Sequence, residues 1–129
     1  MSSNANTRRI LIVDDEELIV LAMRKFFLAR GYEVDTAQQL GETQALLANE
    51  PYDLVISDLR LTGAHGMEGL QVVAEVHRRS AHTRVIVLTA FGTPEIERES
   101  YELGAHAFLH KPTAMSEIAD VAAALLAGR

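Results

Sequence analysis

The sequence contains no cysteine among its 129 residues. This absence excludes a disulfide scaffold, a thiolate nucleophile and a zinc site with sulfur ligands, and it fits a reducing compartment. Long apolar runs are missing as well, so no segment is long enough to span a bilayer. Residues 1–8 are polar and lack the apolar stretch of a signal peptide. We therefore expect a cytoplasmic protein without a membrane segment, in which residues 1–8 form a disordered tail.

Positive charge is also scarce. The chain has 12 Lys and Arg residues against 18 Asp and Glu residues, which gives a net charge of −6. Because an acidic surface repels a polyphosphate backbone, direct binding of nucleic acid by this domain is not expected. Hydrophobic residues make up 48% of the chain and charged residues 23%, as in ordinary soluble proteins. The length suffices for one domain with its own core, which we assign to residues 9–129.

Short apolar runs alternate with segments of helical periodicity along the whole chain. The runs expected to form strands are rich in Ile, Val and Leu, and they cover Ile10–Val13, Val34–Ala37, Leu54–Ser57, Val85–Leu88 and Ala107–Leu109. The expected helices cover Glu16–Arg30, Leu40–Asn49, Gly69–Arg79, Pro94–Leu103 and Met115–Ala127. An apolar face of the first helix can be formed by Leu18, Leu21, Ala22 and Phe26. Strict alternation predicts an α/β fold with a parallel sheet, right-handed crossovers and helices on both faces.

Polar side chains collect at the carboxyl ends of the expected strands, where ligands bind in sheets of this kind. The first strand ends in Asp14 and Asp15, and the third ends in Asp58. Thr89 follows the fourth strand, and Lys111 follows the fifth. We therefore expect three carboxylates, one hydroxyl and one ammonium group to meet at one edge of the sheet.

This set of groups indicates phosphoryl transfer. Two carboxylates about 4 Å apart repel each other by roughly 4 kcal/mol at an effective dielectric constant of 20, so a cation is expected between them. An all-oxygen site with few protein ligands suits Mg²⁺ or Mn²⁺. Lys111 and the hydroxyl of Thr89 would bind phosphoryl oxygens, and Asp58 would be the nucleophile that forms an acyl phosphate. Each residue alone is explained by a cap, a turn or a strand, and only their combination favours this chemistry.

Four short motifs resemble those of response-regulator receiver domains. They are VDDEE at 13–17, ISDLR at 56–60, VLTA at 87–90 and HKP at 110–112, and the resemblance extends from about residue 9 to the last helix. It implies a flavodoxin-like, doubly wound (βα)5 fold with a five-stranded parallel sheet in the order 2-1-3-4-5. It also implies a two-component phosphorelay, in which a histidine kinase or a histidine phosphotransfer protein passes a phosphoryl group to an aspartate. Such a domain controls a partner or an output domain, and at most catalyses its own phosphorylation and dephosphorylation.

The resemblance assigns a role to each residue that matches a motif. Asp58 corresponds to the phosphoacceptor. Asp15 and Asp58 correspond to direct Mg²⁺ ligands, Asp14 to a ligand that acts through water, and Arg60 to a residue whose backbone carbonyl completes the metal site. The loop that follows departs from the family pattern, because residues 62–66 make it longer than usual. We expect this loop to affect partner choice and the lifetime of the phosphoryl group.

The remaining matches concern phosphoryl binding and the switch. Thr89, the backbone N–H of Ala90 and Lys111 correspond to the groups that receive the phosphoryl oxygens. Phe108 corresponds to an aromatic residue that turns inward as the threonine moves toward the phosphate, and the bond before Pro112 is usually cis in the family. Phosphorylation is expected to change the surface of the fourth helix, the fifth strand and the fifth helix, which can also support a phosphorylation-dependent homodimer.

Two further residues flank the expected site, and five histidines are spread along the chain. Arg60 and Phe91 each lie two residues beyond a motif residue, where an attacking water would approach, and we hypothesise that they slow hydrolysis of the acyl phosphate. The five histidines are scattered without ligand spacing, so a metal site built from them is rejected, and His65 alone lies in a loop near the expected site.

Two other functions compete with the receiver interpretation. A small Mg²⁺-dependent phosphohydrolase would also use a strand-end aspartate, but it needs an acidic residue at the position that Arg60 occupies. A flavodoxin-like cofactor binder would need a phosphate-binding loop after the first strand, and the acidic DDEE sequence there would repel phosphate. Both a stand-alone receiver and a receiver cut from a longer protein are consistent with the sequence.

Overall fold

The computed structural model describes residues 7–61 and 66–127. The strands are β1 (Arg9–Val13), β2 (Glu33–Ala37), β3 (Leu54–Ser57), β4 (Arg84–Thr89) and β5 (Ala107–His110). The helices are α1 (Glu17–Ala29), α2 (Leu40–Asn49), α3 (Glu68–Arg79), α4 (Pro94–Leu103) and α5 (Met115–Ala127). None of these helices, within the two described segments, is long and apolar enough to cross a membrane. The expected tail and the unusual loop fall mostly outside the described residues, which exclude 1–6 and 62–65.

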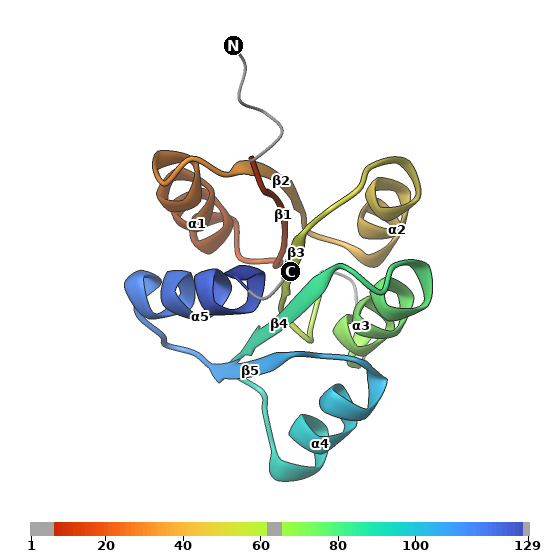
Figure 1. The fold of residues 1–129 in the computed structure, drawn as a ribbon. Helices are drawn as coiled ribbons and strands as arrows, with labels where there is room; N and C mark the ends of the chain where they lie inside the picture. The colour runs from red at the N-terminus through yellow and green to blue at the C-terminus, as the bar shows by residue number, and fades with distance from the viewer. Residues whose placement is uncertain (1–6, 62–65, 128–129) are drawn as a thin grey trace.

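The five strands form one parallel sheet in the order β2-β1-β3-β4-β5, which confirms the predicted fold. Helices α1 and α5 cover one face, and α2, α3 and α4 cover the other (Figure 1). The central strands β1, β3 and β4 are covered on both sides, which explains why their sequences are almost continuously apolar. Alternate residues of these strands therefore belong to two separate core clusters, one on each face of the sheet. Leu11, Val55 and Val87 belong to one cluster, and Ile12, Ile56 and Ile86 to the other.

The apolar face predicted for α1 is wrong. The structure buries Val20, Met23 and Phe27, whereas Leu18 is 81% exposed and Leu21 is 47% exposed. The helix is apolar around most of its circumference, so the periodicity of the sequence allows more than one face to point inward. The face of α1 that packs against the sheet and α5 is the one that carries the large ring of Phe27, which is fully buried.

Gly69 joins the start of α3 closely to the end of β3. Its backbone N–H donates a hydrogen bond of 2.8 Å to the carbonyl of Leu59. A Cβ at this position would overlap the carbonyl oxygen of Asp58 and the Cα of Leu59, both of which are backbone atoms. Because backbone atoms cannot rotate out of the way, only glycine allows this approach. The contact fixes the segment that carries Asp58 against the first turn of α3.

We expect Gly69→Ala to lower the free energy of unfolding by about 2–3 kcal/mol, because the added methyl group forces β3 and α3 apart. Urea denaturation of the purified protein measures this quantity. Gly41→Ala in α2 is the matched control, since its added Cβ meets no atom within 4 Å. That variant should keep or slightly increase stability, by about 0.5–1 kcal/mol at most. Equal stability of the two variants would contradict the close-approach explanation.

Candidate functional site

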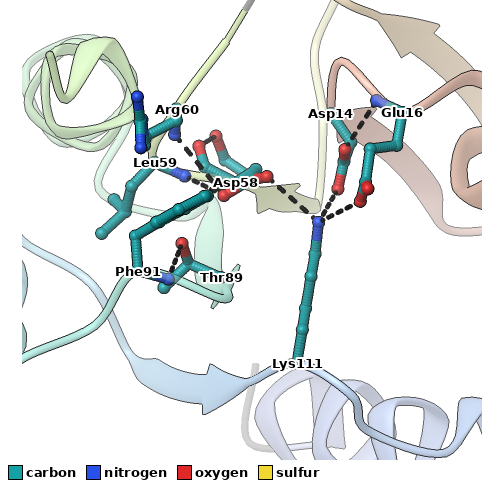
Figure 2. A network of polar contacts seen from close by, with 9 residues as sticks. Asp14, Glu16, Asp58, Leu59, Arg60, Thr89, Phe91 and Lys111 are labelled. Carbon is teal, nitrogen blue, oxygen red and sulfur yellow. Dashed lines mark hydrogen bonds and ion pairs between the residues drawn. The ribbon is translucent and has the colours of Figure 1, made fainter.

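The predicted polar residues meet at the carboxyl edge of the sheet. Asp14 follows β1, Asp58 follows β3 and Lys111 follows β5, so the three side chains come from separate strand ends. Asp14 is 2% exposed and Asp58 is 4% exposed, which is unusual for carboxylates and requires partners for their charge. Figure 2 shows the Lys111 side chain reaching from the end of β5 to a position between the two carboxylates.

Lys111 provides the positive charge at the centre of this group. Its Nζ lies 2.7 Å from Asp14 Oδ2 and 3.0 Å from Asp58 Oδ2. A third contact, of 3.1 Å, reaches Oε1 of Glu16. An ammonium group has three N–H donors, so all three can be used here in charge-assisted hydrogen bonds. Glu16 was not predicted as a member of the site, and the only sequence signal was its place in the acidic run DDEE.

The surroundings shift the ionisation of two of these groups. Burial raises the pKa of the Asp14 carboxyl above its ordinary value, although the hydrogen bond from Lys111 opposes this shift. Burial alone would lower the pKa of Lys111, but Asp14 and Asp58 outweigh it and raise that pKa. Lys111 therefore stays protonated and remains a permanent positive charge in the site.

The second oxygen of Asp58 is held by the backbone. Asp58 Oδ1 accepts a hydrogen bond of 2.6 Å from Leu59 N–H and a longer one of 3.5 Å from Arg60 N–H. The backbone N–H of Asp58 donates to the carbonyl of Val13 at 2.8 Å, which ties this residue to the end of β1. Since both oxygens and the backbone are fixed, the carboxylate has one orientation, facing the end of the sheet.

Thr89 and Ala90 lie at the end of β4, between the strand ends that carry Asp58 and Lys111. The Thr89 side chain is completely buried, and its Oγ1 accepts a hydrogen bond of 3.1 Å from Phe91 N–H. Its carbonyl accepts a hydrogen bond of 2.9 Å from Lys111 N–H. Ala90, in contrast, is exposed. By accepting this bond, the Thr89 side chain helps to order the loop that leads to α4.

Arg60 and Phe91 contact each other beside the site. The Arg60 guanidinium carbon lies 4.4 Å from the centre of the Phe91 ring, a cation–π contact. The two residues come from the β3–α3 and β4–α4 loops, and Figure 2 shows them on the side of Asp58 opposite to Asp14. A role beside the site was predicted for each residue from the sequence, but their contact with each other was not.

Asp14, Asp15 and Asp58 form a cluster suited to a metal ion. One carboxylate oxygen from each lies within 4.8 Å of the others, and this is the one such cluster of acidic or histidine side chains in the described segments. Asp15 is exposed, so the cluster opens to solvent on that side. Hard oxygen ligands, few in number and open to water, fit Mg²⁺ or a similar divalent cation. His65 lies outside the described residues.

Phe108 and the bond before Pro112 complete the site region. The Phe108 ring is 7% exposed and belongs to the core cluster on the side of α2, α3 and α4. The Lys111–Pro112 peptide bond is cis, as the sequence resemblance implied.

Known protein families include one that matches most of this chain. The family described as "Response regulator receiver domain" matches residues 10–123. The chain belongs to this family. Receiver domains act in two-component signalling, where they accept phosphoryl groups from histidine kinases or phosphotransfer proteins.

Curated relatives and solved structures agree with that assignment. Sporulation initiation phosphotransferase F of Bacillus subtilis is 32% identical, with 87% of this chain and 88% of that protein covered. The photosynthetic apparatus regulatory protein RegA of Cereibacter sphaeroides is also 32% identical. The matching region covers 86% of this chain but only 59% of RegA.

Two solved receiver structures are close in shape. A CheY-like receiver domain protein from Methanospirillum hungatei JF-1 has a TM-score of 0.89 and 28% identity, covering 95% of this chain and 96% of that chain. The response regulator TrrA from Thermotoga maritima, solved in complex with Mg²⁺ and BeF, has a TM-score of 0.80 and 30% identity, covering 93% of this chain and 100% of that chain. The likeness thus extends over nearly the whole receiver domain.

We expect Mg²⁺ to raise the thermal unfolding midpoint of the receiver domain. A ligand that binds only the folded state adds about 2.7 kcal/mol at a concentration one hundred times its Kd. Asp15→Asn removes the exposed carboxylate of the cluster and leaves the ion pairs of Lys111 intact, so this variant should lose most of the increase. Glu17→Gln removes an exposed carboxylate outside the cluster and is the control. Differential scanning fluorimetry measures the midpoint with and without Mg²⁺. An equal rise in the wild type and in both variants would place the ion elsewhere.

Proposed function

We propose that this receiver domain accepts a phosphoryl group on Asp58 from a histidine kinase or a histidine phosphotransfer protein. The observation that carries the proposal is the setting of the Asp58 carboxylate, which is buried, fixed by backbone N–H groups on one oxygen and paired with Lys111 on the other. A carboxylate held in one orientation reacts with little further loss of freedom. The alternative of a phosphohydrolase lacks support, since the position two residues after Asp58 is Arg60 rather than an acid.

The reaction is a transfer between two nucleophiles. An oxygen of the Asp58 carboxylate attacks the phosphorus of a phosphohistidine, an O–P bond forms, and the N–P bond breaks with its electron pair returning to the imidazole nitrogen. The product is an acyl phosphate on Asp58 and a free histidine on the donor. Lys111 exchanges one of its carboxylate contacts for a phosphoryl oxygen, and the Thr89 hydroxyl and the Ala90 N–H donate to the others.

A divalent cation, Mg²⁺ or Mn²⁺, would be held by Asp14, Asp15 and Asp58, with the Arg60 backbone carbonyl as a further ligand. When bound, it neutralises charge that develops on the transferring phosphoryl oxygens. The donor set supports this assignment because it is composed of oxygen ligands alone. TrrA, one of the similar structures, was solved in complex with Mg²⁺ and BeF.

The output of the phosphorylated domain is carried by the surface of α4, β5 and α5. Thr89 ends β4 and its hydroxyl orders the loop that leads into α4, so a change at the phosphoryl site reaches α4 directly. Phosphorylation adds negative charge and acceptor oxygens, which shift the populations of the two arrangements of this surface. The surface then acts on a partner protein, on an output domain or on a second copy of the chain. Tyr101 on α4 is 45% exposed and offers a large side chain for such a contact.

We expect acetyl phosphate and Mg²⁺ to add the mass of one phosphoryl group to the wild-type protein, as measured by intact mass spectrometry on ice. Asp58→Asn should abolish the addition, because an amide oxygen is too weak a nucleophile. Asp120→Asn, which removes an exposed carboxylate on α5, should label like the wild type. Labelling of the Asp58→Asn protein, or a wild-type protein that never labels, would overturn the proposed function.

We expect Phe91→Ala to shorten the lifetime of the acyl phosphate. The cation–π contact with Arg60 is worth about 0.5–1 kcal/mol and holds the ring where it restricts the approach of water, so its loss should speed hydrolysis by a factor of about two to five. Decay of the phosphorylated protein after removal of the donor gives this rate.

Arg60→Ala should produce a similar increase, and the double variant little more, because both changes remove the same contact. Arg30→Ala breaks the distant cation–π contact of Arg30 with Phe26, at 4.5 Å, and provides the control. Unchanged decay in both Phe91→Ala and Arg60→Ala would rule out a role for the stack.

A further inference from the structure

Gly92 lies in the β4–α4 loop, between Thr89 at the end of β4 and Thr93, the N-cap residue of α4. Its backbone does not require glycine. The glycines with positive φ in the described part of the chain are Gly31 and Gly104, so Gly92 has a conformation open to other residues. The reason for a glycine at position 92 must lie in the atoms that surround it.

Those atoms belong to two rings of β5. A Cβ at position 92 would lie 2.7 Å from Cε1 and 2.9 Å from Cζ of Phe108, and 3.1 Å from Cε1 of His110. The two rings contact each other edge to face with their centres 5.3 Å apart, and Phe108 is 7% exposed. The backbone of Gly92 therefore forms the wall of the pocket in which the end of the Phe108 ring sits.

Other close glycines have different neighbours. A Cβ on Gly69 would meet backbone atoms, and one on Gly104 would meet the imidazole of His77. Gly92 is distinguished, among the described glycines, because its missing Cβ makes room for the ring of Phe108.

We propose that Gly92 is a positioning residue that opens the inward seat of Phe108, and that any side chain at position 92 closes this seat. The proposal rests on the proposed function, because Phe108 is the residue expected to respond to the phosphoryl site. It adds a residue from the β4–α4 loop to the path between that site and the α4–β5–α5 surface.

The loop is held at both ends, so the ring is the part that must yield. Phe91 N–H donates to Thr89 Oγ1 at 3.1 Å on one side of Gly92. On the other side, Thr93 Oγ1 accepts from Ile96 N–H at 3.1 Å and fixes the start of α4. Phe108, in contrast, lies on the edge strand β5 next to the exposed His110, and its side chain can rotate outward without breaking a hydrogen bond of the backbone. A methyl group on residue 92 should therefore expel the ring rather than displace the loop.

The same geometry links the seat to the phosphoryl site. The hydroxyl that orders the loop is that of Thr89, which is expected to donate to a phosphoryl oxygen. Gly92 is the residue that follows Phe91, whose N–H binds this hydroxyl. Movement of Thr89 toward the phosphoryl group thus moves the wall of the Phe108 seat, and the contact between Gly92 and Phe108 carries the movement to β5.

The position of the ring can be measured by fluorine NMR on protein labelled with 4-fluorophenylalanine. The chain has four phenylalanines, so the Phe108 signal is assigned from the one that Phe108→Leu removes. The shift of each signal between H₂O and D₂O reports exposure of that ring to solvent. With Mg²⁺ and beryllofluoride, the Phe108 signal of the wild type should be insensitive to this exchange and that of Gly92→Ala should become sensitive.

Gly41→Ala, whose added methyl group meets open space, is the matched control and should behave as the wild type. Bound beryllofluoride gives fluorine signals of its own, which should persist in Gly92→Ala and vanish in Asp58→Asn. Their absence from the wild type would count against the proposed function. The ring measurement, repeated without beryllofluoride, judges the seat independently, and a Phe108 signal that stays insensitive in Gly92→Ala under both conditions overturns the role of Gly92.

A double variant separates a seat for the ring from a general requirement for glycine. Leucine lacks the Cε1 and Cζ atoms that a Cβ on residue 92 would meet. Gly92→Ala should therefore lower the thermal unfolding midpoint more in the wild type than in the Phe108→Leu background, where only the His110 ring remains close to the added methyl group. Equal losses in the two backgrounds would show that Gly92 does not act through Phe108.

Discussion

The ion pairs of Lys111 are the interaction on which the site depends. Two carboxylates, Asp14 and Asp58, are almost completely buried at the ends of neighbouring strands. Without a cation, their mutual repulsion and the cost of removing them from water would force one of them to take up a proton or to move into solvent. Lys111 lies 97 residues from Asp14 and 53 from Asp58 in the sequence, so its contacts also tie β5 to the centre of the sheet. The same ion pairs therefore balance the buried charge and hold the strand ends together.

Backbone groups around these ion pairs fix the orientation of the Asp58 carboxylate. Asp58 receives N–H groups on Oδ1, and Gly69 allows the start of α3 to lie against the backbone of Asp58 and Leu59. Side chains alone would leave the carboxylate several rotamers. A carboxylate fixed by backbone groups keeps its direction before any partner approaches it, so little freedom is left to lose on reaction.

The sequence predicted the parts of the structure that depend on local patterns. The strand order was implied by the family that the motifs resemble. The ends of α2, α4 and α5 agree with the structure to the residue, because Pro94 and Gly104 mark their helix clearly and the others have distinct apolar spacing. The position of Asp14, Asp58 and Lys111 at one edge followed from the rule that parallel strands place their carboxyl ends together.

The errors and omissions concern choices that are made only in three dimensions. Leu18 and Leu21 were expected on an apolar face, but α1 offers two such stripes and the packing of Phe27 selects the other. The contact of Arg60 with Phe91 joins two loops, and the fit of Gly92 against Phe108 joins a loop to a strand. Neither has a periodic signature, because the partners are far apart in sequence and their spacing is set by the sheet.

Glu16 is the acceptor that Lys111 can release when a new anion binds at the site. The three N–H donors of Lys111 are taken by Asp14, Asp58 and Glu16, so a phosphoryl oxygen must replace one of these acceptors. The Asp14 side chain is 3% exposed and would be left as an unpaired buried charge, whereas the Glu16 side chain is 58% exposed and returns to water. An exposed ion pair contributes about 0–1 kcal/mol, so Glu16 is the contact released at least cost. Lys111 can thus turn toward a new anion while Asp14 keeps it anchored, and the strand ends stay together as the phosphoryl group is bound.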